Sequence, residues 1–176
     1  VVGVGAPVVG AVEGWYVPRY VIEGDAKRKL EAKAPDLKSV ADLAQYANVF
    51  KDPEEPSKGR FYNCPAGWTC ELDNTQMLKE YGLEDKFTNF RPGTGPALDA
   101  AALSSYKRGE PILFYYWTPT PLMGQIDLVK LEEKPGVDKT VSIKVGLSKT
   151  FHEQAPELVG VLEKVNIPID ILNQNL

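Results

Sequence analysis

Residues 111–117 read Pro-Ile-Leu-Phe-Tyr-Tyr-Trp, an unbroken apolar run of strand length. A run of this kind, without alternating polar positions, predicts a strand that is buried on both faces. It ends at Thr118-Pro119-Thr120-Pro121, where proline cannot continue a hydrogen-bonded ladder. Residues 96–108 come just before it and predict a helix, with apolar residues at helical spacing and Gly109 as its stop. A helix followed by a fully buried strand is typical of an α/β fold.

The rest of the chain continues this alternation. Strands are expected over residues 1–12 (or an extended crossing segment there), 15–22, 87–90, 126–136 with a turn, and 140–146. One helix is expected to begin within residues 35–43, capped by Ser39 or Asp36, and a second to cover 71–81. A third is expected to run from Ser148 past Pro156 to Val165, with apolar residues that point inward: Leu158, Val161, Leu162 and Val165. Residues 167–176 are expected to form a final helix or a tail. Residues 51–60 form a polar loop. The pattern predicts an α/β fold with a mixed or mainly parallel sheet and flanking helices.

Composition excludes several classes of protein. The chain has 176 residues, 43% hydrophobic and 25% charged, which fits one large domain or two small ones. Its 24 acidic and 20 basic residues include no basic block, so nucleic acid is not an expected partner. Its apolar stretches are too short to span a bilayer, which takes about 20 residues. No basic segment with a cleavage site is present, so a signal peptide is absent or already removed.

The second informative stretch is a loop, Asn63-Cys64-Pro65-Ala66-Gly67-Trp68-Thr69-Cys70, which holds both cysteines of the chain. The spacing alone leaves a disulfide and two free thiols about equally plausible, and Pro65 and Gly67 favour a closed ring. Such a ring would hold Trp68 in place and orient nearby backbone N–H groups. The loop therefore indicates ligand recognition rather than catalysis.

Catalytic and metal-binding signals are weak. His152 is the one histidine of the sequence and lies in an expected helix. The sequence contains no nucleophile-elbow motif with which it could act, so we expect it to be an exposed helical residue. Gly93-Thr94-Gly95 lacks the Lys-Ser/Thr of a phosphate loop. Two cysteines and one histidine are too few for a structural zinc site. We therefore expect no catalytic residue, no metal and no cofactor, and a protein that is not an enzyme.

Tryptophan placement carries more information. Trp15, Trp68 and Trp117 all lie at the ends of expected elements, within two residues of Gly or Pro. Each is a candidate core residue, but that interpretation is weaker for Trp68, in its small ring, and for Trp117, at the end of a strand where α/β proteins bind ligands. Facing aromatic rings attract a cation by about 0.5–2 kcal/mol per ring. They would select a quaternary ammonium group, whose methyls preclude stronger hydrogen bonds.

Four motifs resemble one known family. They are residues 63–71, Phe114-Tyr115-Tyr116-Trp117-Thr118-Pro119, Gly14-Trp15-Tyr16-Val17-Pro18 and the helix after Ser148. In this order and spacing they resemble the substrate-binding protein of glycine betaine/choline ABC transporters, over most of the chain. The resemblance implies the type II periplasmic-binding-protein fold, with ligand held between two lobes, and a periplasmic or extracellular location.

The resemblance also implies roles for individual residues. Trp68 and Trp117 would line an aromatic cage, and the N–H groups of Thr69 and Cys70 would receive a ligand carboxylate. Trp15 matches a family motif near the lobe crossing and is a lesser cage candidate. The implied partners are a small quaternary ammonium ligand and an ABC permease, with membrane contact only through that permease. Betaine, choline and carnitine-like ligands all stay open.

The resemblance also implies that the chain lacks the N-terminal part of the first lobe. We expect residues 1–14 to be an inter-lobe crossing, 15–138 the second lobe with the aromatic site, and 139–176 the return crossing and the C-terminal part of the first lobe. The chain would then be a fragment or a truncated gene product that keeps half of a cage. A ligand-sensing module without a transport role is the alternative function, and an enzyme acting on a choline-like substrate is a third.

Overall fold

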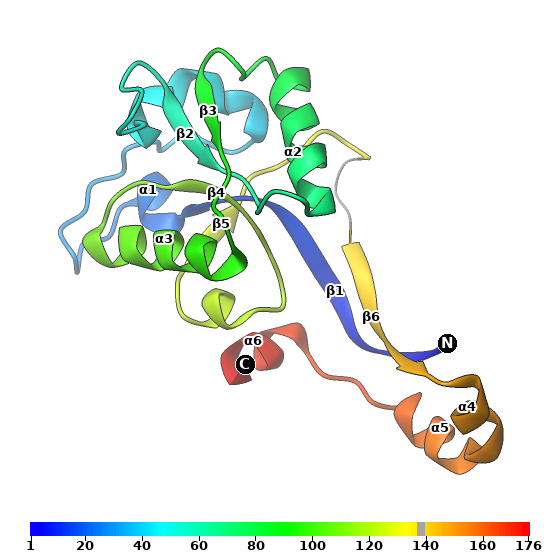
Figure 1. The fold of residues 1–176 in the computed structure, drawn as a ribbon. Helices are drawn as coiled ribbons and strands as arrows, with labels where there is room; N and C mark the ends of the chain where they lie inside the picture. Colours follow the sequence, from blue (N-terminus) through cyan, green and yellow to red (C-terminus); the bar gives the residue numbers. More distant parts are fainter. Residues whose placement is uncertain (137–139) are drawn as a thin grey trace. The chain divides into compact units, whose positions relative to one another are not determined.

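The structure is a computed structural model and describes residues 1–136 and 140–176. The chain divides into two compact units, which we describe separately. Unit 1 contains residues 1–13, 117–125 and 140–176, and unit 2 contains residues 14–116 and 126–136. The first strand is long and contributes residues to both units (Figure 1).

The sheet of unit 2 surrounds the strand that the apolar run predicted. Its strands follow the order β3 (Phe87–Phe90), β2 (Gly59–Tyr62), β4 (Leu113–Trp117), β1 (Val2–Pro18) and β5 (Leu128–Lys130). β2 pairs in parallel with β3 and β4, whereas β5 runs antiparallel to β1. The sheet is therefore mixed, and with its flanking helices it confirms the α/β class.

β4 is buried on both faces, as its sequence predicts. Leu113 and Phe114 have no exposed surface, and Tyr115 and Tyr116 are also buried. Hydrogen-bonded neighbours on both sides, β2 and β1, leave this strand no free edge (Figure 1). Apolar residues at every position are stable only in such a place, because each face must pack against other side chains.

The two long helices of unit 2 lie where the sequence predicts them. They are α2 (Thr69–Glu80) and α3 (Gly95–Arg108). Thr94 caps α3 by accepting a hydrogen bond from the Ala97 N–H at 3.2 Å, and Gly109 ends it in the left-handed conformation, with φ 71°. Ser39 is the N-cap of η1 (Val40–Phe50), a 3₁₀ segment that replaces the expected α-helix.

Two predictions in unit 2 are wrong. Residues 19–22 were expected to continue a strand, but α1 (Arg19–Glu23) begins there, and the Arg19 guanidinium pairs with Glu23 one turn later at 2.9 Å. β2 was missed, because its four residues lie between a polar loop and the cysteine ring. Only its parallel pairing with β3 and β4 makes it a strand.

In unit 1 the first part of β1 pairs antiparallel with β6 (Thr140–Leu147), with register shifts between Val4 and Val8 and between Val9 and Ala11. The expected helix from Ser148 to Val165 is two helices, α4 (Lys149–Gln154) and α5 (Pro156–Leu162). Proline has no N–H to donate and starts a new helix instead of continuing the old one. α6 (Ile169–Asn175) agrees with the expected final helix.

The break at Pro156 also reverses an expected face. Leu158 and Val161 were predicted to point inward but are 55% and 61% exposed, whereas Val159 is buried. Val165, another of the predicted inward residues, lies beyond the end of α5 and is exposed as well. The expected lobe boundary at 138/139 falls outside the described residues, and the division into lobes stays a prediction.

Candidate ligand-binding site

The cysteine loop is closed by a disulfide between Cys64 and Cys70, whose Cα atoms are 6.3 Å apart. The bridge resolves the choice between a ring and two free thiols. The loop begins where β2 ends, since the Asn63 N–H donates to the Phe90 carbonyl of β3 at 2.8 Å. It ends in the first turn of α2. The ring therefore lies at the carboxyl end of a parallel strand, where open α/β sheets commonly bind ligands.

Trp68 is the N-cap residue of α2, and its side chain is 41% exposed. Its N–H donates to the Pro65 carbonyl at 3.2 Å, and its carbonyl accepts from the Glu71 N–H at 3.1 Å. A Cβ built on Gly95, the first residue of α3, would stand 3.5 Å from Cη2 of Trp68. The edge of the indole thus lies over the start of α3, while much of the ring remains accessible.

Thr69 and Cys70 are the first two residues of α2. N–H groups in the first turn of a helix have no intrahelical acceptor and carry the positive end of the helix dipole. They suit an anion, provided that no competing negative charge points at them. Glu71 follows directly, but its carboxylate is directed away to the Arg91 guanidinium, with Nε and Oε1 2.5 Å apart, and is largely buried.

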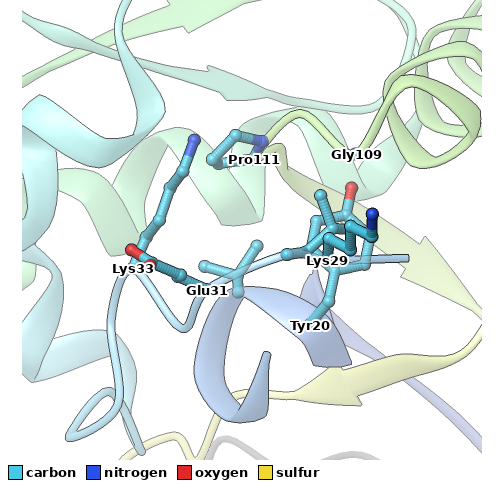
Figure 2. A pocket seen from close by; sticks show the side chains of 8 residues that line it. Tyr20, Lys29, Glu31, Lys33, Gly109 and Pro111 are labelled. Atoms are coloured by element: carbon cyan, nitrogen blue, oxygen red, sulfur yellow. The ribbon is translucent and has the colours of Figure 1, made fainter. Parts of the chain in front are cut away.

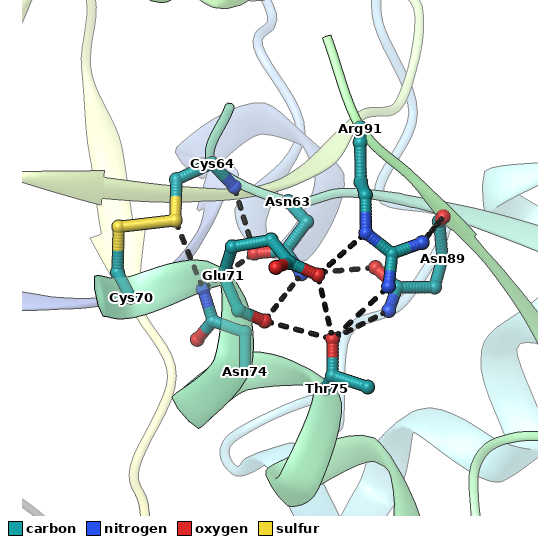
Figure 3. A network of polar contacts seen from close by, with 8 residues as sticks. All are labelled: Asn63, Cys64, Cys70, Glu71, Asn74, Thr75, Asn89 and Arg91. Atoms are coloured by element: carbon teal, nitrogen blue, oxygen red, sulfur yellow. Dashed lines mark hydrogen bonds and ion pairs between the residues drawn. A yellow bond between two sulfur atoms is a disulfide. The ribbon is translucent and has the colours of Figure 1, made fainter. Parts of the chain in front are cut away.

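A network of polar contacts lies beneath the loop (Figure 3). The Thr75 hydroxyl donates to the Glu71 carbonyl at 2.7 Å and accepts from Asn89 Nδ2 at 2.9 Å. Arg91 Nη1 donates to the Asn89 carbonyl at 3.3 Å. These contacts tie the first turns of α2 to the end of β3 and fix the direction of the helix start.

Trp15 lies in the core of unit 2. It has no exposed surface, its ring stacks on Phe61 with centroids 4.0 Å apart, and its Nε1 donates to Asn74 Oδ1 at 2.8 Å. The indole therefore contacts α2 from the core of unit 2, through Asn74. Its sequence position beside Gly14 gave no sign of this hydrogen bond, because the partner lies 59 residues away.

Trp117 is the last residue of β4 and groups with unit 1. The segment after it is firmly held. The Thr118 N–H donates to the Val12 carbonyl at 2.9 Å, and Asn173 Oδ1 of α6 accepts from the Thr120 N–H at 2.9 Å. Trp68 belongs to unit 2, so the pairing of these two tryptophans in one cage stays a prediction.

Other candidate features do not join this site. His152 lies in α4 as expected but is half-buried rather than exposed. Within the described parts of the chain, no group of three or more His, Cys, Asp or Glu residues is arranged to hold a metal ion. Figure 2 shows a pocket of about 280 Å³ whose lining includes Tyr20, Lys29, Glu31, Lys33, Gly109 and Pro111. None of its lining residues belongs to the cysteine loop or the tryptophan motifs.

Solved structures share this fold. Lactococcal OpuAC in its closed-liganded conformation with glycine betaine is 21% identical, with a TM-score of 0.65 over 97% of this chain and 58% of that one. The glycine/betaine/L-proline-binding protein ProX of Borrelia burgdorferi is 20% identical, with a TM-score of 0.64 over 97% of this chain and 57% of that one. The fold is thus that of the type II periplasmic binding proteins.

Two curated relatives match parts of the sequence. The glycine betaine/proline betaine-binding periplasmic protein of Escherichia coli K12 is 30% identical over 135 residues, which are 73% of this chain and 38% of that protein. The glycine betaine-binding periplasmic protein OusX of Dickeya dadantii is 29% identical over 116 residues, 65% of this chain and 32% of that protein. The aligned residues therefore span about a third of the length of these relatives.

The model of the OpuAC family, the substrate binding domain of ABC-type glycine betaine transport systems, matches residues 1–176. The chain belongs to this family, which consists of solute-binding proteins and not of enzymes. Among residues 1–136 and 140–176, no helix has the length and apolarity that crossing a membrane requires.

Proposed function

We propose that the protein captures glycine betaine, or a related quaternary ammonium compound, outside the cytoplasm and delivers it to an ABC permease. One observation carries this proposal. A tryptophan that is 41% exposed stands directly before two first-turn N–H groups, in a loop closed by a disulfide. The same few residues thus offer an aromatic face and an anion seat.

Glycine betaine carries both groups that such a site attracts. Its trimethylammonium group has no N–H to donate, so an aromatic face is its best partner, with about 0.5–2 kcal/mol per ring. Its carboxylate suits the N–H groups of Thr69 and Cys70. Choline has the cation without the carboxylate, so these two donors favour betaine over choline.

The other tryptophans take different proposed roles. We assign Trp117 to a second wall of the cage, on the strength of its motif and its place at the end of β4. Trp15 is fully buried, so its role is to support α2 through Asn74 and not to contact the ligand. We also propose the expected division of the chain: residues 15–138 are the second lobe with Trp68, 1–14 an inter-lobe crossing, and 139–176 the return crossing and the C-terminal part of the first lobe.

The proposed location is periplasmic or extracellular. The curated relatives are named as periplasmic proteins, and a disulfide persists outside the reducing cytosol. The protein would then meet the membrane only through its permease. If it binds betaine but supports no uptake with that permease, a sensing module is the correct interpretation.

Calorimetric titration with glycine betaine, proline betaine, carnitine and choline tests the proposal. The titration should use the two-lobed protein, expressed as the full-length product of its gene. We expect binding of glycine betaine with a change in tryptophan emission, and none of glycine, which lacks the methyl groups. Failure of every quaternary amine to bind would contradict the proposed function.

A further inference from the structure

Two buried asparagine side chains lie directly beneath the cysteine loop (Figure 3). Asn63 has no exposed surface, and Asn74 is 3% exposed. Asn63 Oδ1 accepts from the Cys64 N–H at 2.7 Å and from Asn74 Nδ2 at 2.8 Å. Asn63 Nδ2 donates to the Glu71 carbonyl at 3.2 Å and to Asn89 Oδ1 at 3.0 Å. The Asn63 amide therefore uses its full capacity of two donated and two accepted bonds.

The direction of these bonds is fixed from one end. The indole N–H of Trp15 can only donate, so Asn74 must turn Oδ1 toward it. Asn74 Nδ2 then faces Asn63 and donates to it, so Asn63 must accept with Oδ1. The Cys64 N–H is also a donor and requires the same oxygen. Each amide consequently has one orientation that satisfies all its neighbours.

This chain of amides holds both ends of the disulfide ring. Asn63 fixes the first cysteine through its N–H. It reaches the residue after the second cysteine through the Glu71 carbonyl. Asn74, one turn further along α2, is anchored to β1 by Trp15. A displacement of the amides would shift Trp68 and the first turn of α2 together.

We propose that Asn63 and Asn74 are positioning residues, which set the geometry of the Thr69 and Cys70 N–H groups and thereby the preference for ligands that carry a carboxylate. The proposal rests on the proposed function of this loop. A purely structural role would change stability and affect all ligands alike. A positioning role weakens carboxylate recognition in a protein that remains folded.

Asn74→Asp is the first test variant. It replaces the donor opposite Asn63 Oδ1 with an acceptor, while the shape of the side chain is kept. Asn63 Oδ1 then loses its donor and no longer holds the loop in place, so we expect the Kd for glycine betaine to rise about tenfold and that for choline, which has no carboxylate, to change much less. Asn48→Asp is the matched control, because Asn48 is an exposed asparagine of the same unit.

Trp15→Phe is the second variant: it removes the N–H donor together with part of the ring, while a phenyl ring can still stack on Phe61. It takes the place of Asn74→Asp in the binding test if Asn74→Asp does not fold. Reduction of the disulfide by dithiothreitol gives a readout that needs no ligand. We expect both variants to be reduced faster than the parent and the Asn48→Asp control to match it.

The outcomes separate the two proposals. If the parent binds no quaternary amine, the proposed function fails, and the reduction rates still test whether the amides hold the ring. If the parent binds betaine, equal losses for betaine and choline in the folded variants overturn the positioning role. Unchanged affinities with unchanged reduction rates overturn it as well.

Discussion

Trp68 combines large size with high exposure at the start of a helix, where small polar caps are usual. Leaving an indole accessible has no benefit for folding. The disulfide, and Gly95 against the ring edge, restrict its movement without covering it. These features favour a ligand-binding role for the exposed part of the ring.

At the residue scale, Trp68→Ala should therefore raise the Kd for glycine betaine by roughly 3- to 30-fold, from the loss of one cation–π contact. Trp68→Phe keeps a ring and should lose less. Leu72→Ala is the control, since Leu72 is an exposed apolar residue of the same helix. Calorimetry measures all three, and an alanine variant at position 68 with the parent's affinity would contradict the assignment.

The parts of the site that were predictable from sequence are contiguous. Residues 64–70 form the disulfide, the exposed indole and the helix start within one loop, and such features follow from local chemistry. The burial of Trp15 and the roles of Asn63 and Asn74 depend on side chains from other elements. No local pattern reveals these contacts.

At the element scale, a buried ion pair joins β2 to the loop before it. Arg60 Nη2 lies 2.7 Å from Asp52 Oδ1, with 8% and 0% of their side chains exposed. The same oxygen accepts from the Glu54 and Glu55 N–H groups at 2.7 and 3.1 Å. The hydrogen bond from Arg60 holds the pKa of the Asp52 carboxyl well below its usual range.

Because folding lowers this pKa, ionised Asp52 stabilises the fold above the unfolded value of about 3.9, and the gain is lost as the pH falls below it. Asp52→Asn should cost about 3–5 kcal/mol near neutral pH, since it removes the buried carboxylate that balances the Arg60 guanidinium and leaves the exposed Glu54 carboxylate, 3.4 Å away, as its ion-pair partner. It should also flatten the loss of stability in acid. Urea unfolding at several pH values measures both effects. Glu54→Gln is the control and should cost under about 1 kcal/mol, because Glu54 is 81% exposed. Equal costs for the two variants would contradict this ranking.

Helix α6 packs closely against η2 (Pro121–Gly124), which begins four residues after Trp117. A Cβ on Gly124 would stand 2.2 Å from the Asn173 carbonyl oxygen, which belongs to the backbone. Gly124→Ala should therefore displace α6 and cost about 1–3 kcal/mol. Gly160→Ala in α5 meets no atom within 4 Å and should stabilise by up to about 1 kcal/mol. Thermal unfolding distinguishes them, and the same Tm for both variants would be inconsistent with this packing.

Element prediction succeeded where the signal was local and failed where pairing decided. β4 and α3 carry strong periodicity and clear stops, and both lie where expected. β2 is a strand only because β3 and β4 flank it. The helix predicted after Ser148 is too long, because the apolar residues on both sides of Pro156 fit one helical pattern. In the structure α4 ends at Gln154 and a new helix, α5, begins at Pro156.

At the scale of the whole molecule, unit 1 exposes many more large apolar side chains than unit 2. They include Val9, Val141, Ile143, Phe151, Leu158, Val161 and Ile171, each at least 40% exposed. In unit 2 the exposed large apolar residues among those described are Trp68 and Leu72. Where such side chains lie together, they favour contacts with another polypeptide or self-association.

The 176-residue chain by itself should therefore bind 1-anilinonaphthalene-8-sulfonate and self-associate as its concentration rises. Dye fluorescence and sedimentation velocity measure these properties. Leu158→Lys with Val161→Lys should reduce both signals, whereas Leu72→Lys in unit 2 should change them little. A monomer without dye binding at high concentration would refute the prediction.

The sequence by itself determined the α/β class, the doubly buried strand and the family, and it favoured the disulfide ring, because each depends on residues that are close together or on motifs in a fixed order. Only the tertiary structure decided that Trp15 is buried, that Asn63 and Asn74 connect the ring to strands β1 and β3, and that β2 exists. The physical reason is the same in each case. Hydrogen bonds and packing between elements join residues that are distant along the chain, and those partners become visible only when the chain is folded.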